Sequence, residues 1–219
     1  MLETHEIETG PHPRTTLIVL HGLGADGFDF VPICGELRLQ AVGPVRYVFP
    51  HAPTRQVTIN NGHVMRAWYD ILGMDLVRRE DEAGLRESQR QIAELIDRES
   101  ARGVPAGRIV LVGFSQGCAM ALMTALRYPH RLGGAVGLSG YLPLAATTTA
   151  ERSAANADLP IFLAHGTQDP IVAPARGAAS RDALQALGHD VEWHDYPMPH
   201  SVCAEEIEDL NAWLLKQLG

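Results

Sequence analysis

Short apolar runs alternate along the chain with longer stretches in which apolar residues recur every three or four positions. Such short runs are typical of buried strands, and the wider spacing is typical of amphipathic helices. The runs predict strands over residues 15–20, 45–49, 108–112, 135–138, 161–164 and 191–196. The spaced pattern predicts helices over residues 28–37, 80–101, 116–127, 174–187 and 204–218. This alternation predicts an α/β fold, with a mostly parallel central sheet and helices on both faces.

Two segments depart from the alternation. Residues 53–74 contain the turn signal Asn60-Asn61-Gly62 and then Trp68-Tyr69-Asp70. Residues 142–158 are rich in alanine, threonine and serine, and we expect a loop with one helical turn there. Neither segment is long enough for a large lid, and no repeat or linker divides the chain. We therefore predict a single domain over residues 1–219.

Composition and charge narrow the range of partners. The 219 residues are 46% hydrophobic and carry a net charge of -8. This length and composition suffice for one well-buried core. The acidic balance and the lack of a lysine or arginine cluster argue against nucleic acid or an anionic membrane as the main partner. No apolar run is long enough to span a bilayer, so we expect no transmembrane segment.

The cysteines and the first residues indicate a compartment. Cys34, Cys118 and Cys203 are far apart and odd in number, which predicts neither a disulfide framework nor a zinc site. Residues 1–6 are polar and acidic, unlike a secretory signal. We expect a cytoplasmic protein whose thiols stay reduced.

The sequence Gly113-Phe114-Ser115-Gln116-Gly117 carries the strongest chemical signal. It follows an apolar β-branched run and precedes a run of small helix-forming residues. A serine between two glycines at such a strand-to-helix turn is the pattern of a nucleophile elbow. The glycines are needed because the turn is strained and side chains on either side would collide. Ser115 is therefore the candidate nucleophile.

A serine hydroxyl needs a base, and the base needs an orienting carboxylate. Asp169 and His200 each follow a predicted strand, on the loops where such groups sit in α/β sheets. The chain order Ser115, Asp169, His200 is that of an α/β-hydrolase. The competing residues are His165 and His194 for the base, and Asp158 and Asp195 for the carboxylate. His194 and Asp195 lie within a strand, Asp158 precedes one, and we expect His165 to support the loop that carries Asp169.

Acyl transfer also needs hydrogen-bond donors for the oxyanion that develops on the carbonyl. The backbone N–H of Gln116, directly after the nucleophile, is one candidate. The loop His21-Gly22-Leu23-Gly24 follows an early strand, and its glycines allow close approach to a substrate. The backbone N–H of Leu23 is the second candidate.

The same loop matches a different motif. Gly22-Leu23-Gly24-Ala25-Asp26-Gly27 reads as GxGxxG after a strand, a pattern of dinucleotide-binding loops. That fingerprint also requires an acidic residue at the end of the next strand, for the ribose. The sequence there is Tyr47-Val48-Phe49-Pro50-His51, which offers no carboxylate. We therefore do not expect nucleotide binding.

Five segments together resemble the carboxylesterase/acyl-protein thioesterase (phospholipase/carboxylesterase) family of α/β-hydrolases, and the likeness is greatest to bacterial carboxylesterases. The segments are His21–Gly27, Trp68–Asp70, Gly113–Gly117, His165–Asp169 and His200. The resemblance covers essentially the whole chain. It implies a triad of Ser115, Asp169 and His200, with the Leu23 and Gln116 amides as the oxyanion hole. It also implies an acyl pocket partly built by residues 68–74, no cofactor, and a possible homodimer.

Two positions depart from the family pattern. Cys118 stands where a second glycine commonly follows the elbow, and Pro199 stands where a glycine usually precedes the histidine. Proline fixes one dihedral angle and removes a donor, so the loop of His200 is expected to be stiffer. A thiol at a helix N-terminus can have a lowered pKa and be oxidisable. The alternative for Cys118 is a small buried residue in place of glycine.

Candidate substrate contacts are apolar residues near the predicted site. They are Trp68, Ile71, Leu72, Met74 and Val172. Ordinary core packing is the alternative for each, and Trp68 and Leu72 are the stronger candidates because their segment interrupts the alternation. We predict a serine carboxylesterase that cleaves short- to medium-chain esters through an acyl-enzyme. The alternatives are an acyl-protein thioesterase and, from another class, a non-catalytic binding module on a hydrolase scaffold.

Overall fold

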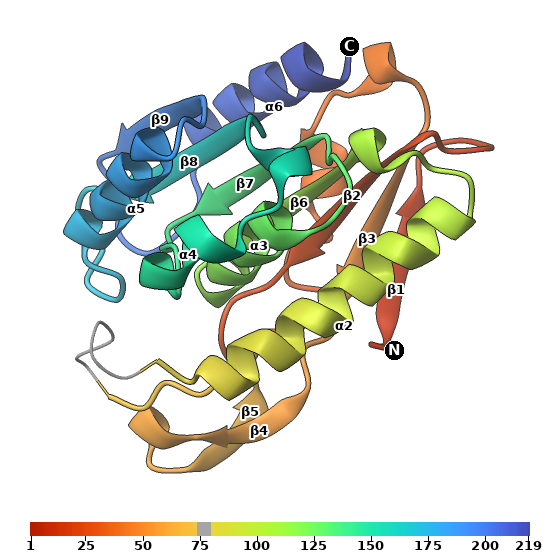
Figure 1. Cartoon of the computed structure of the whole chain (residues 1–219). Helices are drawn as coiled ribbons and strands as arrows, with labels where there is room; N and C mark the ends of the chain where they lie inside the picture. Colours follow the sequence, from red (N-terminus) through yellow and green to blue (C-terminus); the bar gives the residue numbers. More distant parts are fainter. Residues whose placement is uncertain (74–79) are drawn as a thin grey trace.

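The computed structural model describes residues 1–73 and 80–219 (Figure 1). Its centre is a seven-stranded sheet in the order β1-β3-β2-β6-β7-β8-β9. The strands are β1 Thr4–Glu8, β2 Thr15–Leu20, β3 Val45–Pro50, β6 Ile109–Phe114, β7 Gly134–Leu138, β8 Ile161–Gly166 and β9 Val191–Tyr196. β1 is antiparallel to β3, and the other neighbouring strands are parallel. β4 Thr54–Val57 and β5 His63–Arg66 form a separate antiparallel hairpin.

Helices cover both faces of the sheet. They are α1 Ile33–Glu36, α2 Glu82–Ala101, α3 Gln116–Arg127, α4 Ala145–Glu151, α5 Pro174–Ala186 and α6 Ala204–Leu218. Successive side chains of a strand point to opposite faces. Ile18 and Leu20 accordingly pack in one apolar cluster with α2, α3 and α5, whereas Leu17 and Val19 pack in a second cluster with α1 and α6. Figure 1 shows α2, α3 and α5 in front of the sheet and α6 behind it. The expected α/β architecture, with a mostly parallel central sheet and helices on both faces, is confirmed.

Most predicted elements agree with the structure to within two residues, and the exceptions have local causes. The prediction of a helix over residues 28–37 was wrong in length, because only Ile33–Glu36 is helical. Pro32 lacks an N–H, and the Asp26 carboxylate instead accepts the Phe28 N–H at 2.8 Å in a turn. Strand β1 was not predicted, because four of its five residues are half-buried and none is fully buried. No helix in the described ranges is long and apolar enough to cross a membrane.

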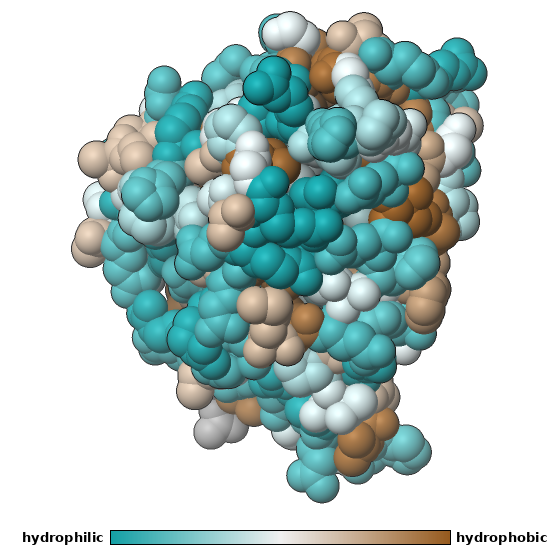
Figure 2. Space-filling model, turned by 90° about the vertical axis from the view of Figure 1, so that its right-hand side faces the viewer, coloured by the Kyte–Doolittle hydropathy of each residue, from teal (hydrophilic) through white to brown (hydrophobic). Residues whose placement is uncertain are grey.

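A buried carboxylate ties β1, β2 and β3 to the C-terminal end of α2. Glu99 has no exposed surface and accepts hydrogen bonds from Thr16 (3.0 Å), Arg46 (2.8 Å) and Arg102 (2.9 Å). Arg46 and Arg102 also pair with Glu8 and Glu6 of β1, respectively. Figure 2 shows this side of the molecule as largely hydrophilic, with separate apolar patches. Ion pairs therefore add to the backbone pairing with β3 in fixing the edge strand.

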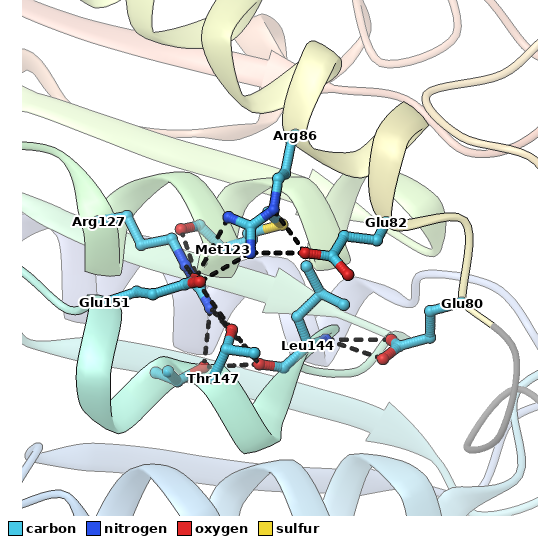
Figure 3. Close-up of polar contacts among 9 residues, drawn as sticks. Glu80, Glu82, Arg86, Met123, Arg127, Leu144, Thr147 and Glu151 are labelled. Carbon is cyan, nitrogen blue, oxygen red and sulfur yellow. Dashed lines mark hydrogen bonds and ion pairs between the residues drawn. The ribbon is translucent and has the colours of Figure 1, made fainter.

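A second polar network joins α2, α3 and α4 (Figure 3). Arg127 of α3 and Arg86 of α2 both donate to the carboxylate of Glu151, at 2.8 and 2.7 Å. Arg127 also donates to Thr147 in the first turn of α4. This is why residues 142–158, expected as a loop with one helical turn, contain the longer helix α4. Leu144, which precedes α4, is held by hydrogen bonds from its N–H to the Glu80 carboxylate at 3.1 Å.

The two arginines lower the pKa of Glu151 from 4.5 to about 2. A carboxyl whose pKa is lowered by folding stabilises the protein above its unfolded pKa and loses that contribution as the pH falls towards the folded value. We expect Glu151→Gln to lower the free energy of unfolding by about 1–2 kcal/mol at pH 7. The difference from wild type should shrink from pH 4.5 towards pH 2. Urea unfolding across this range measures it, with Glu94→Gln on the exposed face of α2 as a control that should change stability by less than about 0.5 kcal/mol. An equal loss at every pH would contradict the role of the charge.

Candidate active site

The turn between β6 and α3 places Ser115 in a strained conformation. Its φ is 57° and its ψ is -117°, in a region that side chains disfavour. A Cβ at Gly113 would lie 2.1 Å from the Gly117 carbonyl oxygen, and one at Gly117 would lie 2.0 Å from the Leu20 carbonyl oxygen. The two glycines are therefore required by close backbone contacts. The turn is locked because the Ser115 N–H donates to the Leu138 carbonyl at 2.9 Å.

Asp169 and His200 form a close pair at the same edge of the sheet. The Nδ1 atom of His200 lies 2.6 Å from Oδ2 of Asp169. The other carboxylate oxygen accepts the N–H groups of Ile171 and Val172 at 2.8 and 2.9 Å. Asp169 is buried, and the His200 side chain is 15% exposed. A carboxylate fixed in this way orients the imidazole and leaves Nε2 available to exchange a proton.

Backbone hydrogen bonds hold the two loops of this pair together. The N–H of Thr167 donates to the Tyr196 carbonyl at 2.8 Å, and the N–H of Gln168 donates to the Met198 carbonyl at 3.1 Å. Both bonds cross from the loop of Asp169 to the segment that leads into His200. The distance between carboxylate and imidazole is thus set by the backbone on both sides.

Phe114 connects the histidine with the serine. Its ring lies 4.7 Å from the His200 ring, centre to centre, and Phe114 directly precedes Ser115. On the other side, a Cβ at Gly22 would lie 3.4 Å from Cβ of Ser115. The structure therefore brings the three predicted triad residues and the loop after β2 to one edge of the sheet.

The two candidate oxyanion donors belong to rigid backbone. Within the described residues, neither the Leu23 N–H nor the Gln116 N–H has an acceptor. The neighbouring Gly24 N–H donates to the Arg66 carbonyl at 2.9 Å, which fixes the loop. Gln116 begins α3, where the free N–H groups and the helix dipole favour negative charge. Both amides are thus available for an oxyanion.

His21 anchors the loop after β2, a role that the sequence analysis missed. Its Nε2 accepts the Ala52 N–H at 3.1 Å, so its protonated Nδ1 donates to the Gly22 carbonyl at 2.7 Å. Burial lowers the pKa of His21, which favours this neutral form. The feature of the sequence that could have identified this role is the position of His21 at the start of a loop with two glycines. The imidazole holds the loop in place from within the core.

The GxGxxG segment has a structural use in this loop. Gly27 donates its N–H to Nδ1 of His51 at 3.1 Å, and His51 directly follows β3. A histidine thus occupies the place where a dinucleotide fold needs a ribose-binding carboxylate. In the described part of the chain, no cluster of three histidine, cysteine or acidic side chains could hold a metal ion.

The competing histidines have other partners. Nε2 of His165 lies 2.9 Å from the Val172 carbonyl and 3.4 Å from the Asp169 carboxylate, so it supports the loop of Asp169 as expected. His194 lies in β9 and contacts Glu192 and Asp209. Of the competing carboxylates, Asp158 pairs with exposed Arg131 and Asp195 is exposed in β9.

The structure separates the predicted substrate contacts. Trp68 has no exposed surface, and its indole N–H donates to the His21 carbonyl at 2.9 Å. It therefore supports the oxyanion loop from the core, and its prediction as a substrate contact was wrong. Ile71 is half-buried, Leu72 is 39% exposed and Val172 is 7% exposed. Met74 lies outside the described residues.

One exposed apolar residue near the site was not predicted. Ile171, two residues after Asp169, is 69% exposed although it is large and apolar. The feature of the sequence that could have identified Ile171 is its place directly after Asp169-Pro170, at the end of the loop that carries the aspartate. Exposed apolar side chains beside a reactive centre are typical of a site that receives an apolar substrate.

Cys118 is an inert core residue. It is 1% exposed, and burial raises its pKa to about 12, so the hypothesis of a reactive thiol was wrong. A Cβ at Gly137 or Gly140 would lie 2.6 Å from its sulfur. The cysteine fits beside the elbow because glycines occupy the facing positions.

Comparison with known proteins places the chain among hydrolases. The Phospholipase/Carboxylesterase family model matches residues 2–218. Acyl-protein thioesterase 1 of Yarrowia lipolytica is 41% identical over 204 residues, which cover 91% of this chain and 90% of that protein. The crystal structure of Arabidopsis thaliana SOBER1 has a TM-score of 0.89 at 32% identity, covering 94% of this chain and 100% of the other. Zea mays acyl-protein thioesterase 2 has a TM-score of 0.88 at 31% identity, covering 100% of both chains.

Replacing the candidate nucleophile tests the site directly. We expect Ser115→Ala to lower kcat on p-nitrophenyl esters by about 10³-fold or more, because the acyl-enzyme cannot form. The variant should also lose labelling by a fluorophosphonate probe. Ser100→Ala, at the exposed end of α2, should keep both properties. Near-normal turnover by Ser115→Ala would refute the assignment.

A matched pair of carboxylate variants tests the orienting group. Asp169→Asn should lower kcat by roughly 10³–10⁴-fold, since an amide neither favours the required tautomer of His200 nor stabilises its charged form. Asp195→Asn removes the same charge from the rival residue and should leave kcat within about twofold. Steady-state kinetics on one ester measures both. Equal losses in the two variants would contradict the pairing of Asp169 with His200.

Proposed function

The chain belongs to the phospholipase/carboxylesterase family and is a serine hydrolase, and we propose that its substrates are acyl thioesters carried by proteins. The observation that carries this proposal is the similarity to acyl-protein thioesterases from a fungus and a plant, over at least nine-tenths of the chain. This similarity favours thioester hydrolysis over the short- to medium-chain carboxylesterase activity expected from the sequence. It also weighs against a non-catalytic binding module.

The reaction proceeds through an acyl-enzyme. His200, oriented by Asp169, accepts the proton of Ser115 while the serine oxygen bonds to the thioester carbonyl carbon. The negative oxygen of the intermediate accepts hydrogen bonds from the Leu23 and Gln116 amides. The carbon–sulfur bond then breaks, and the sulfur leaves as a thiol with the proton held by His200. Water, deprotonated by His200, releases the fatty acid and restores Ser115.

The acyl chain is assigned to the side of the site on which α3 and α5 lie. Val172 belongs to the apolar cluster of that face, and Ile71 packs against the same cluster. Their chain neighbours Leu72 and Ile171 expose apolar surface. An acyl chain that covered Leu72 and Ile171 would remove this surface from water, at about 25 cal/mol per Å² of buried apolar area. These two residues are the proposed apolar contacts.

The compartment and assembly remain predictions. Cys34, Cys118 and Cys203 are all unpaired, which supports a reducing compartment such as the cytoplasm. A homodimer, a single domain over residues 1–219 and the lack of nucleic-acid partners are likewise still predictions.

Matched substrates separate the two activities. We expect a higher kcat/KM, by about tenfold or more, for an acyl-cysteine peptide thioester than for the peptide ester in which serine replaces the cysteine. The acyl chain, the peptide and the reacting carbonyl are then otherwise the same. Steady-state kinetics with both substrates checks this, and the corresponding base-catalysed rates correct for the greater intrinsic reactivity of the thioester. A corrected preference for the ester would overturn the proposal in favour of a carboxylesterase.

A further inference from the structure

A surface groove begins beside the candidate catalytic histidine. One hollow of about 380 Å³ is lined by Phe30, Ile33, Val202 and Ile207, among others. A second hollow of about 220 Å³ shares Glu36 and Ile207 with the first. The two hollows therefore adjoin each other along α1 and the first turns of α6. We call the two together the α1–α6 groove.

One end of the groove lies near the candidate catalytic histidine, His200. Val202 follows His200 by two residues. On the opposite wall, the ring of Phe30 lies 5.6 Å from that of Phe114, which in turn lies 4.7 Å from the ring of His200. The groove therefore starts on the side of the histidine that faces α1 and α6.

The groove and the proposed acyl contacts lie on opposite faces of the sheet. Ile33 and Ile207 belong to the apolar cluster under α1 and α6, and Phe30 and Val202 pack against it. Val172 belongs instead to the cluster under α2, α3 and α5. A thioester has two arms that diverge from one carbonyl carbon. One arm is the acyl chain, and the other is the peptide attached through the sulfur. If the acyl chain follows the α3 and α5 side, the peptide is directed to the other side, towards the α1–α6 groove.

The chemistry of the leaving group supports the same direction. The sulfur must lie next to His200 to receive the proton that this residue took from Ser115. The chain attached to the sulfur therefore starts where the groove starts. The groove is open to solvent along its length, so a polypeptide can continue beyond it.

The walls of the groove are acidic. Asp29, Glu36 and Glu208 line it and are exposed, whereas Arg38 is the one basic lining residue among those that the structure describes. Within the described ranges, none of these three carboxylates makes an ion pair. The walls are also fixed to each other, because the Arg38 N–H donates to the Asn211 side chain at 2.7 Å. Apolar floor residues suit the aliphatic stems of lysine and arginine, whose charged ends would reach the acidic walls.

We propose that the α1–α6 groove binds the peptide that carries the acylated cysteine, and that it selects peptides with lysine or arginine near that cysteine. This inference rests on the proposed thioesterase function, since it places the leaving group of that reaction. Charge complementarity in an exposed groove affects discrimination between partners more than overall affinity.

Competitive inhibition tests the groove without requiring thioester cleavage. The probes are two S-alkyl cysteine peptides, which are uncleavable thioethers, with either lysines or glutamates beside the cysteine. Each is titrated against hydrolysis of a p-nitrophenyl ester at low ionic strength. We expect the lysine peptide to have an inhibition constant about tenfold lower than the glutamate peptide, and the ratio to shrink in 0.5 M salt because the charges are screened.

Charge-removing variants locate the effect. In the double variant Glu36→Gln/Glu208→Gln, the inhibition constant of the glutamate peptide should exceed that of the lysine peptide by only about threefold or less. The control Glu87→Gln/Glu94→Gln removes the same two charges from the exposed face of α2, and its ratio should stay near the wild-type value. An unchanged ratio in the groove variant, an equal fall in both variants, or inhibition by neither peptide would overturn the proposal. Failure of the thioester substrates themselves would instead overturn the proposed function, and the inhibition ratios would still report on the groove.

Discussion

The close contact between the start of α3 and the end of β2 is the constraint on which the site depends. A Cβ at Gly117 would lie 2.0 Å from the Leu20 carbonyl oxygen and 2.8 Å from that of His21. The helix that follows the candidate nucleophile therefore rests on the strand end from which the candidate oxyanion loop emerges. The same contact sets the position of Ser115 and its separation from Leu23. Any side chain at position 117 would push the two halves of the site apart.

The residues around this contact act as supports for it. The His21 carbonyl accepts the indole N–H of Trp68, and the Gln116 side chain accepts the Trp68 N–H and donates to the Tyr69 carbonyl, both at 3.0 Å. Segment 68–69 is thus bound both to the start of the loop that carries Leu23 and to Gln116. The sequence identified this segment as important, but burial cannot be read from an isolated aromatic residue. The sequence therefore predicts a substrate contact at Trp68, where the structure has a support.

The extent of burial along an element also explains which helices and strands were predictable from the sequence. Strands β2 and β6 and helix α3 are buried nearly along their whole length, so their apolar pattern alone marks their bounds. The candidate triad was predictable because its residues follow strands in a characteristic order. Strand β1 and helix α4 depend instead on ion pairs with distant arginines, which no local pattern contains: Arg46 and Arg102 pair with β1, and Arg127 pairs with α4. Cys118 was a similar case, because the facing Gly137 and Gly140 that admit it are far along the chain.

Pro199 shows how the candidate site tolerates an unusual residue next to His200, its candidate base. Proline has no N–H, but the hydrogen bonds of this turn use carbonyl groups: the Met198 carbonyl accepts the Gln168 N–H at 3.1 Å, and the Pro199 carbonyl accepts the Ser201 N–H at 2.9 Å. The missing donor is therefore not needed. Since Asp169 also binds Nδ1 of His200 directly, the imidazole is held from the backbone and from the carboxylate. A stiffer residue at position 199 then adds to the order of the loop, because proline restricts the unfolded chain without removing a bond of the folded one.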